Sequence, residues 1–370
     1  MGSDNIIKLS IRNMSSIGFE VELHDELPVQ FQERDFLIKT TLQGNEKQNI
    51  QYTVKPLSRG EYHFGNTLLF IKSKLGLINR RIELETTQSV AVYPSILLMK
   101  QLELKTFTRI SHHYGIKKLR RIGHSYEFEQ IKNYVRGDDY RSINWKATSR
   151  RSELMVNQYQ EEKSQQVYCI IDKSRSMRMP FDGLTLLDHS INTALILSNT
   201  AIKKDDKVGL LTFSNSINRV IKSDKGGRQL KNILEALYKE KEHVLESNYE
   251  LLYQGIRTTV KGRSLIFLFT NFESYQALER VLPYLRRINK SHLLVVIFFE
   301  NTELSNFAAT DAKDTEEIYQ QTMAKKNMQE KTLIVNELKK YGIQSILTKP
   351  EALPLNSINK YLELKSRGLI

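Results

Sequence analysis

Hydrophobic and polar residues alternate along residues 4–95 without helical periodicity. Short stretches such as IIKLSIRN, FLIKTTLQG and TLLFIKS are separated by Gly, Pro and Asn turns. Alternation with frequent turns is typical of antiparallel strands that bury one face. We therefore predict an immunoglobulin-like β-sandwich over residues 4–95.

The pattern changes from residue 165 onward. Unbroken apolar runs, such as QQVYCII, KVGLLTF, SLIFLFT and HLLVVIFF, alternate with amphipathic segments such as LLDHSINTALILSNTAIKK. Continuous apolar strands are expected where helices cover both faces of a parallel sheet. The pattern predicts a doubly wound α/β domain with a mostly parallel sheet over residues 165–370. Residues 96–164, rich in Arg, Lys and aromatic residues, form a basic connecting region.

Oxygen-bearing side chains gather where three of these segments end. Asp172, Ser174 and Ser176 follow QQVYCII at alternating positions, Ser247 precedes a predicted helix, and Asn271 follows SLIFLFT. Ligands of open α/β sheets bind at the carboxyl ends of the strands. Hard oxygen ligands suit Mg²⁺ or Mn²⁺, although Ser and Asp are also common capping and turn residues. A cation site and a set of capped turns both remain open.

The order of DKSRSM, KVGLLTFSN, SNYELL and LFTNF resembles a von Willebrand factor A domain. In that family a metal-ion-dependent adhesion site (MIDAS) uses a D-x-S-x-S loop, a Thr in a second loop and an Asp in a third. The resemblance implies that Ser174 and Ser176 coordinate through hydroxyls and Asp172 directly or through water. Ser247 replaces the Thr, and Asn271 replaces the Asp. Because a carboxylate is lost, a weak, degenerate or partner-completed site is an alternative.

A second resemblance lies upstream, in EFEQIKNYVRGDDYRSINWKATSRRSELMVNQYQEE. This stretch is similar to the signature of the bacterial family called domain of unknown function 58. Cation–π and bidentate ion pairs are expected within it. We predict a wedge that holds the sandwich to the α/β domain, with a partner-docking surface as the alternative. The residues concerned are Arg136, Asp138, Arg141, Trp145 and Lys146.

The resemblance implies a non-enzymatic protein-interaction or scaffold role, in which the adhesion site binds an acidic residue of a partner. Such proteins usually carry an N-terminal membrane anchor and are associated with MoxR-type AAA+ ATPases. The expected partner is therefore such an ATPase, and the expected location is the cytoplasmic face of the bacterial inner membrane. The opening MGS is typical of a vector remnant, so we expect native membrane segments to be missing before residue 4.

Composition narrows the alternatives. The net charge is +13, and residues 117–151 hold ten Lys and Arg against four Asp and Glu. Nucleic-acid binding by this basic segment is therefore the alternative function. Cys169 is the only cysteine, which excludes an internal disulfide and favours a reducing compartment. No apolar run approaches the roughly 18 residues of a membrane span, so the polypeptide as written is expected to be soluble. G-x-S-x-G and P-loop patterns are absent, and nothing favours an enzyme.

Overall fold

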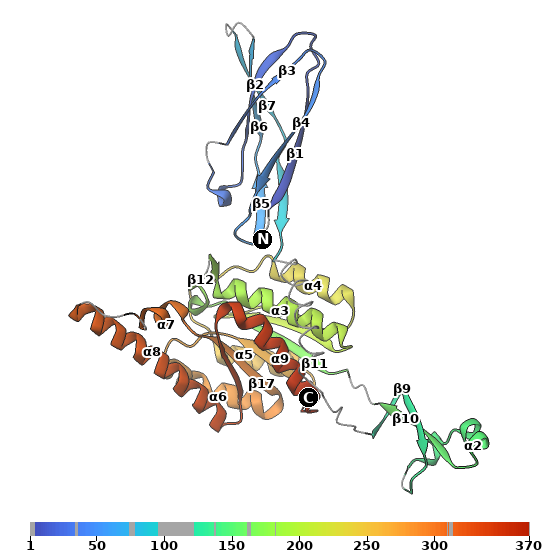
Figure 1. Ribbon diagram of the computed structural model, residues 1–370. Helices are drawn as coiled ribbons and strands as arrows, with labels where there is room; N and C mark the ends of the chain where they lie inside the picture. The colour runs from blue at the N-terminus through green and yellow to red at the C-terminus, as the bar shows by residue number, and fades with distance from the viewer. Residues whose placement is uncertain are drawn as a thin grey trace.

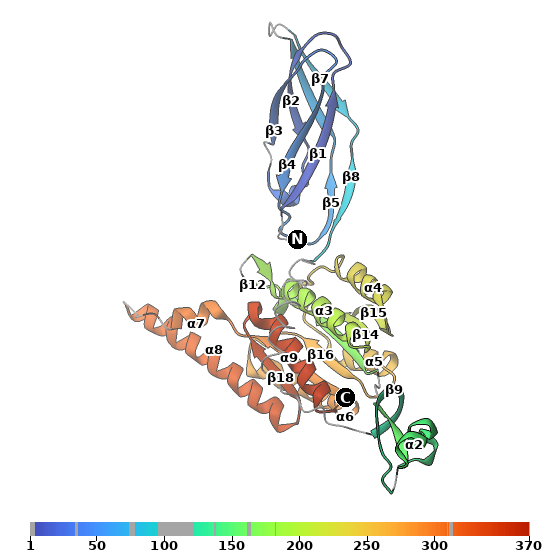
Figure 2. The ribbon, with the colours of Figure 1, turned by 45° about the vertical axis from the view of Figure 1, so that its right-hand side comes forward.

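The computed structural model describes residues 4–33, 36–73, 78–94, 122–136, 138–160, 164–181, 183–308, 310 and 314–369. Strands from the first three of these ranges stand at one end of a larger α/β part (Figure 1). A small ribbon with one short helix projects from another side of the α/β part (Figures 1 and 2).

The N-terminal strands form two layers. One layer is a four-stranded antiparallel sheet in the order β3-β2-β6-β7, and the other contains the pairs β1–β4 and β5–β8. The two layers share a core of Val21, Leu23, Leu42, Ile50 and Leu69. The strands are β1 (Asn5–Arg12), β2 (Phe19–Asp25), β3 (Leu37–Leu42), β4 (Lys47–Val54), β5 (Gly60–Phe64), β6 (Thr67–Ser73), β7 (Asn79–Leu84) and β8 (Gln88–Val92), with a 3-10 turn, η1 (Val29–Phe31).

The predicted alternation is present in these strands. In β4, for example, Ile50, Tyr52 and Val54 are buried and the residues between them are exposed. The layers therefore form as the period-two pattern requires. The immunoglobulin-like assignment itself stays a prediction.

The α/β part is built on a six-stranded sheet in the order β15-β14-β11-β16-β17-β18. Every neighbouring pair is parallel except β14–β15, which is antiparallel. This confirms the predicted mostly parallel α/β sheet. The strands are β11 (Gln166–Asp172), β14 (Lys207–Phe213), β15 (Ile217–Asp224), β16 (Leu265–Phe269), β17 (Leu293–Phe299) and β18 (Gln344–Thr348).

Helices cover both faces of this sheet, so it is doubly wound. Alternate residues of β11 point to opposite cores, with Cys169 and Ile171 in one and Tyr168 and Ile170 in the other. The first face carries α3 (Leu186–Lys203), α4 (Gly227–Leu237) and α9 (Leu353–Ser366), and the second carries α5 (Tyr249–Thr259), α6 (Tyr275–Ser291) and α8 (Thr315–Lys340). The remaining short elements are η3 (Arg175–Met177), β12 (Pro180–Phe181), β13 (Leu184–Thr185), α7 (Thr302–Ala308) and η4 (Pro350–Ala352).

The strand order reverses at β11. The next sheet strand in the chain, β14, pairs on one side of β11, and β16 pairs on the other. The connections therefore diverge at the carboxyl end of β11. In doubly wound sheets this switch point leaves a crevice where ligands bind.

The projecting ribbon lies within the predicted connecting region, of which residues 96–121, 137 and 161–163 are outside the described part. It consists of β9 (Ile122–Asn133), η2 (Tyr140–Ser142), α2 (Trp145–Arg151) and β10 (Met155–Gln160), with β9 and β10 antiparallel. The side chain of Asn144 caps α2 by accepting from the Ala147 N–H at 3.0 Å. We call residues 131–157 of this unit the signature module.

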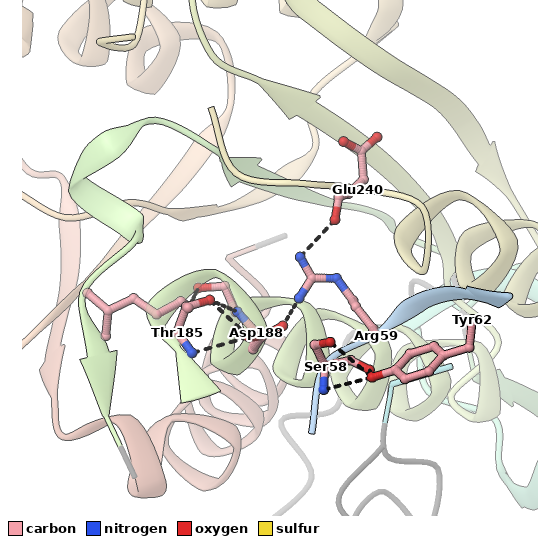
Figure 3. Close-up of polar contacts among 8 residues, drawn as sticks. Ser58, Arg59, Tyr62, Thr185, Asp188 and Glu240 are labelled. Atoms are coloured by element: carbon pink, nitrogen blue, oxygen red, sulfur yellow. Dashed lines mark hydrogen bonds and ion pairs between the residues drawn. The ribbon is translucent and has the colours of Figure 1, made fainter. Parts of the chain in front are cut away.

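A buried arginine joins the N-terminal layers to the α/β part (Figure 3). Arg59 lies in the turn before β5, and its guanidinium forms an ion pair with Asp188 of α3. Its second terminal nitrogen donates to the backbone carbonyl of Glu240 at 2.9 Å. The turn is held by Tyr62, whose hydroxyl donates to the Ser58 carbonyl at 2.8 Å. Burial lowers the pKa of Arg59 to about 10, which leaves it charged at neutral pH.

Further contacts surround Arg59 at this junction. Lys239 pairs with Glu61 at 3.0 Å, and the Tyr238 hydroxyl donates to the same carboxylate at 3.2 Å. The rings of Tyr93 and Tyr238 lie 5.0 Å apart. Within the described residues, the junction is therefore made by the turn before β5 and by the end of β8, not by the signature module.

Candidate functional site

The carboxylate of Asp172 is the centre of the polar cluster at the switch point. One of its oxygens accepts from the Ser174 N–H at 2.9 Å and from the Ser247 hydroxyl. The other accepts from the Thr270 hydroxyl at 2.8 Å. Burial raises the pKa of this carboxyl, and the hydrogen bonds offset part of the rise. Asp172 thus supplies a buried acceptor for one backbone N–H and for hydroxyls from two other segments of the chain.

Ser174 and Ser176 present their hydroxyls on one side of the loop after β11. Ser174 adopts an extended conformation and caps the single turn of η3, which brings the two side chains together. Their Oγ atoms lie 3.0 Å apart. Adjacent oxygens around an octahedral Mg²⁺ with ~2.1 Å bonds are separated by ~3.0 Å, so this spacing fits two neighbouring ligands.

The second loop delivers Ser247 through the start of α5. Asn248 caps this helix, because its side-chain oxygen accepts from the Glu250 and Leu251 N–H groups at 3.0 and 3.1 Å. The Asn248 N–H donates to the Ser214 carbonyl at 2.8 Å, which ties the loop to the end of β14. Ser247, immediately before this cap, is thereby held within reach of Asp172.

The third loop brings Asn271 to the cluster, but its amide oxygen faces away from the hydroxyls. Lys331 of α8 donates to this oxygen at 3.0 Å, and the amide nitrogen donates to the Ser176 carbonyl at 3.3 Å. An ammonium group only donates and a carbonyl only accepts, so these two partners fix the amide orientation. Asn271 therefore holds the loop after β11 in place through the Ser176 carbonyl. Its amide oxygen is engaged by Lys331 and is not directed at a cation among the hydroxyls.

Lys331 is itself buried beside the site. Its ammonium also donates to the Phe272 carbonyl, and its side chain belongs to a helix far along the sequence. Burial lowers the pKa of Lys331 to about 8, although the charges of Glu273 and Glu330 act in the opposite direction. A positive charge thus occupies the place next to the third loop.

The two cationic residues of the DKSRSM loop point away from the hydroxyls. Lys173 is buried and forms an ion pair with Glu240, while Arg175 pairs with Glu246 at 2.9 Å. The Glu240 carboxylate also accepts from the Thr212 hydroxyl at 3.2 Å. The charges of Lys173 and Arg175 are therefore balanced by these carboxylates.

All five predicted site residues come together at this edge of the sheet. Three hydroxyls, from Ser174, Ser176 and Ser247, gather around Asp172. A hydroxyl that donates its proton to a carboxylate keeps lone pairs for a cation. The described residues contain no cluster of three or more His, Cys, Asp or Glu that could hold a metal, so a cation here would rely on hydroxyl ligands. Asn271 contributes to this site by a hydrogen bond to the Ser176 carbonyl, not as a ligand.

Two contributors are absent from the predicted set of ligands. Thr270 follows the apolar strand β16, so the sequence places it beside Asn271 but gives it no role. Lys331 lies 60 residues beyond Asn271 in the chain and has no local motif. Only the packing of α8 against the sheet reveals it.

The signature residues are placed away from the junction of the two large parts. Asp138 accepts from Lys132 at 2.9 Å and from the Val135 N–H at 2.9 Å, and these bonds lower the pKa of Asp138. Trp145 is 70% exposed, and the Arg141 guanidinium lies 5.7 Å from the ring centroid of Tyr140. Arg136 and Lys146 are also exposed. The expected wedge is therefore not formed by the described residues.

A protein-family model covers residues 130–332, which include the signature module, the hydroxyl cluster and Lys331. Its description is "Protein of unknown function DUF58", and the chain belongs to this family. The "Uncharacterized protein YeaD" of Bacillus subtilis (strain 168) is 22% identical over 190 residues, which are 51% of this chain and 44% of that protein. The alignment thus spans less than half of the relative's length.

Solved structures give low similarity scores. The SpRpn10 VWA domain has a TM-score of 0.31 at 11% identity, covering 52% of this chain and 93% of the other. An uncharacterized membrane spanning protein from Vibrio fischeri has a TM-score of 0.19 at 12% identity, covering 54% and 98%. The architecture described above rests on strand order and pairing alone. Among the described helices, none is long and apolar enough to cross a membrane.

Proposed function

We propose that this protein is a non-enzymatic interaction protein whose α/β part binds an acidic residue of a partner at the carboxyl edge of its sheet. One observation carries the proposal: hydroxyls from two separate loops gather around the buried Asp172 at the switch point of the sheet. A doubly wound sheet binds its ligands at this point. Membership of the DUF58 family does not itself assign an activity, because the family is described as one of unknown function.

In this proposal the hydroxyls of Ser174, Ser176 and Ser247 coordinate Mg²⁺ or Mn²⁺. The Asp172 carboxylate, hydrogen-bonded to Ser174 and Ser247, provides the negative charge that balances the cation. A cation with neutral hydroxyl ligands remains electrophilic, so a partner carboxylate can complete its coordination. The hydrogen bonds to Asp172 and the Asn248 cap orient the hydroxyls before the partner arrives. We infer a modest affinity for the cation alone, because Asn271 supplies no carboxylate.

The partner and the location follow from the family resemblance. A MoxR-type AAA+ ATPase is the proposed partner, and the cytoplasmic face of the bacterial inner membrane is the proposed location. The net charge of +13 supports a position near anionic lipids. The two antiparallel layers around one shared core support an immunoglobulin-like N-terminal domain.

Calorimetric titration with Mg²⁺ and Mn²⁺ tests the cation site. We expect saturable binding to the wild-type protein and at least a roughly tenfold loss of affinity in Ser174→Ala, because one hydroxyl ligand is removed. Ser216→Ala removes an exposed hydroxyl from the loop after β14 and should bind like wild type. Acetate, as a stand-in for the partner carboxylate, should tighten binding only where Ser174 is present. Equal affinities of wild type and Ser174→Ala, with intact folds by circular dichroism, would reject the proposed ligands.

A further inference from the structure

The signature module exposes large apolar side chains. Trp145, Tyr140 and Val135 are 70%, 68% and 61% exposed, while the module buries Met155 and Val156 against its own strands. The module also projects from the α/β part on a side away from the N-terminal strands (Figures 1 and 2). Its outer surface is therefore open to a partner.

A pocket of about 270 Å³ lies between α2 and the β9–β10 ribbon. Three cationic residues, Lys146, Arg150 and Arg151, line it together with the apolar residues Ile131, Ala147 and Met155. Lys146 and Arg150 are four positions apart and so lie on the same face of α2, and Arg151 lines the pocket from the last position of this helix. The pocket thus combines positive charge with an apolar floor.

The acidic residues of the module are already committed to local structure. Asp138 pairs with Lys132 at 2.9 Å, Asp139 accepts from the Arg141 N–H at 3.0 Å, and Glu153 accepts from the Asn133 amide at 2.9 Å. None of them pairs with the pocket cations.

The three cationic residues of the pocket, by contrast, form no ion pair with these acids. Among the residues whose side chains the structure describes, which leave out Glu127 and Glu129 of β9, no carboxylate lies within ion-pair distance of Lys146, Arg150 or Arg151. Three cations without a counter-charge around one concavity repel each other unless an anion enters. This local imbalance points to an anionic ligand that the described residues do not supply.

We propose that this pocket is a docking site for an acidic segment of a partner protein, separate from the hydroxyl cluster. Arg150 and Arg151 provide planar guanidinium groups that bind a carboxylate through paired hydrogen bonds. Lys146 adds a point charge, and the apolar floor accommodates the methylenes of the acidic side chain or an adjacent apolar residue.

The surroundings favour a short acidic segment over a continuous polyanion. Only three of the six Lys and Arg residues of the module line the pocket, and they surround a single small concavity. A peptide with a few carboxylates matches this number of charges, whereas an extended phosphate backbone is bound along a wider basic surface. The concave shape also selects an inserted side chain over a flat lipid surface.

Energy transfer from Trp145 provides a direct test, because it is the only tryptophan of the chain. The probe is a short dansyl-labelled peptide of alternating glutamate and leucine, titrated in EDTA so that the hydroxyl cluster holds no divalent ion. We expect saturable transfer, and a roughly tenfold or greater loss of affinity in the double variant Arg150→Gln and Arg151→Gln. The single substitution Lys146→Gln, which disturbs α2 less, should weaken binding in the same direction.

The matched control is Arg228→Gln with Arg263→Gln, which removes the same charge from two exposed arginines outside the module. It should bind the peptide within about twofold of wild type, since both removed charges lie outside the pocket. Equal weakening in both double variants would mean that net charge alone attracts the peptide, and this would overturn the docking site. Tighter Arg150- and Arg151-dependent binding of phosphatidylglycerol vesicles or of a labelled oligonucleotide would also overturn it, in favour of a phosphate ligand.

Because the titration contains EDTA, its outcome is independent of the cation site. Loss of peptide binding would leave the hydroxyl cluster untouched, and failure of the calorimetric titration would leave this docking site untouched.

Discussion

Lys331 contacts Asn271, the residue that stands where the resembled adhesion site has an aspartate. An aspartate there would pair directly with the buried ammonium, whereas the asparagine accepts from Lys331 and donates to the Ser176 carbonyl at once. The amide therefore links α8 to the loop after β11 without adding negative charge. In the proposed cation site, the hydroxyls and not a second carboxylate would therefore be the ligands.

The burial of Lys331 predicts a stability that rises with pH. The pKa of Lys331 falls from its ordinary 10.5 to about 8 on folding, so between these values the unfolded chain binds more protons. By linkage, Lys331 alone should increase the free energy of unfolding by up to about 2 kcal/mol between about pH 8 and about pH 9.5, and the buried Cys169 thiol, whose pKa is raised to about 12, should offset part of this increase. Urea unfolding at several pH values measures this increase. Higher pH is avoided, because burial raises the pKa of Tyr52 and Tyr361, whose unfolded forms then ionise.

Two variants decide whether Lys331 causes the rise. Lys331→Met should abolish it, whereas Lys326→Met, which changes an exposed lysine of the same helix, should keep the wild-type slope. A rise of the same size in Lys331→Met would show that another group is responsible.

At the scale of elements, the 3-10 turn η3 after β11 and the N-terminus of α5 position the site. The cap of α5 fixes the backbone on which Ser247 lies, and the turn of η3 sets the separation of Ser174 and Ser176. These elements were predictable, because continuous apolar runs and polar residues at their ends have local sequence signals. The amide orientation of Asn271 was not, since it depends on a residue of a distant helix.

The cap of α5 gives a prediction that separates stability from binding. Asn248→Ala should cost about 1 kcal/mol of unfolding free energy, because two helix N–H groups lose their acceptor. It should also weaken Mn²⁺ binding, since Ser247 loses its anchored neighbour. Ser274→Ala removes the cap of α6 and should cost a similar free energy while leaving Mn²⁺ binding unchanged. Unfolding and calorimetric titration of both variants check this. Mn²⁺ binding that falls equally in both would show only general destabilisation.

At the scale of the whole molecule, the site and the N-terminal layers share one residue. The Glu240 carbonyl accepts from Arg59, and its carboxylate pairs with Lys173 between Asp172 and Ser174. Glu240 thus connects the turn before β5, through its backbone carbonyl, to the loop after β11, through its side chain; Figure 3 shows the Arg59 contact. The N-terminal layers and the backbone that presents the hydroxyls therefore contact the same residue, Glu240.

Sequence patterns could not predict this connection. Arg59 and Glu240 are 181 residues apart, and a single arginine in a turn carries no signal of its partner. The basic, aromatic signature instead suggested the junction, because its composition suits ion pairs and cation–π contacts. In the structure these basic and aromatic residues lie on the exposed surface of the signature module. Periodicity predicted the α/β sheet because strand burial is a local property, whereas contacts between the large parts are not.

The most direct test of the central claim is anomalous diffraction from crystals of this protein soaked in Mn²⁺. The account predicts one peak at coordination distance from the hydroxyls of Ser174, Ser176 and Ser247, with the amide oxygen of Asn271 still turned to Lys331. A peak bound directly to the Asn271 oxygen, or ordered peaks only at surface carboxylates, would contradict it.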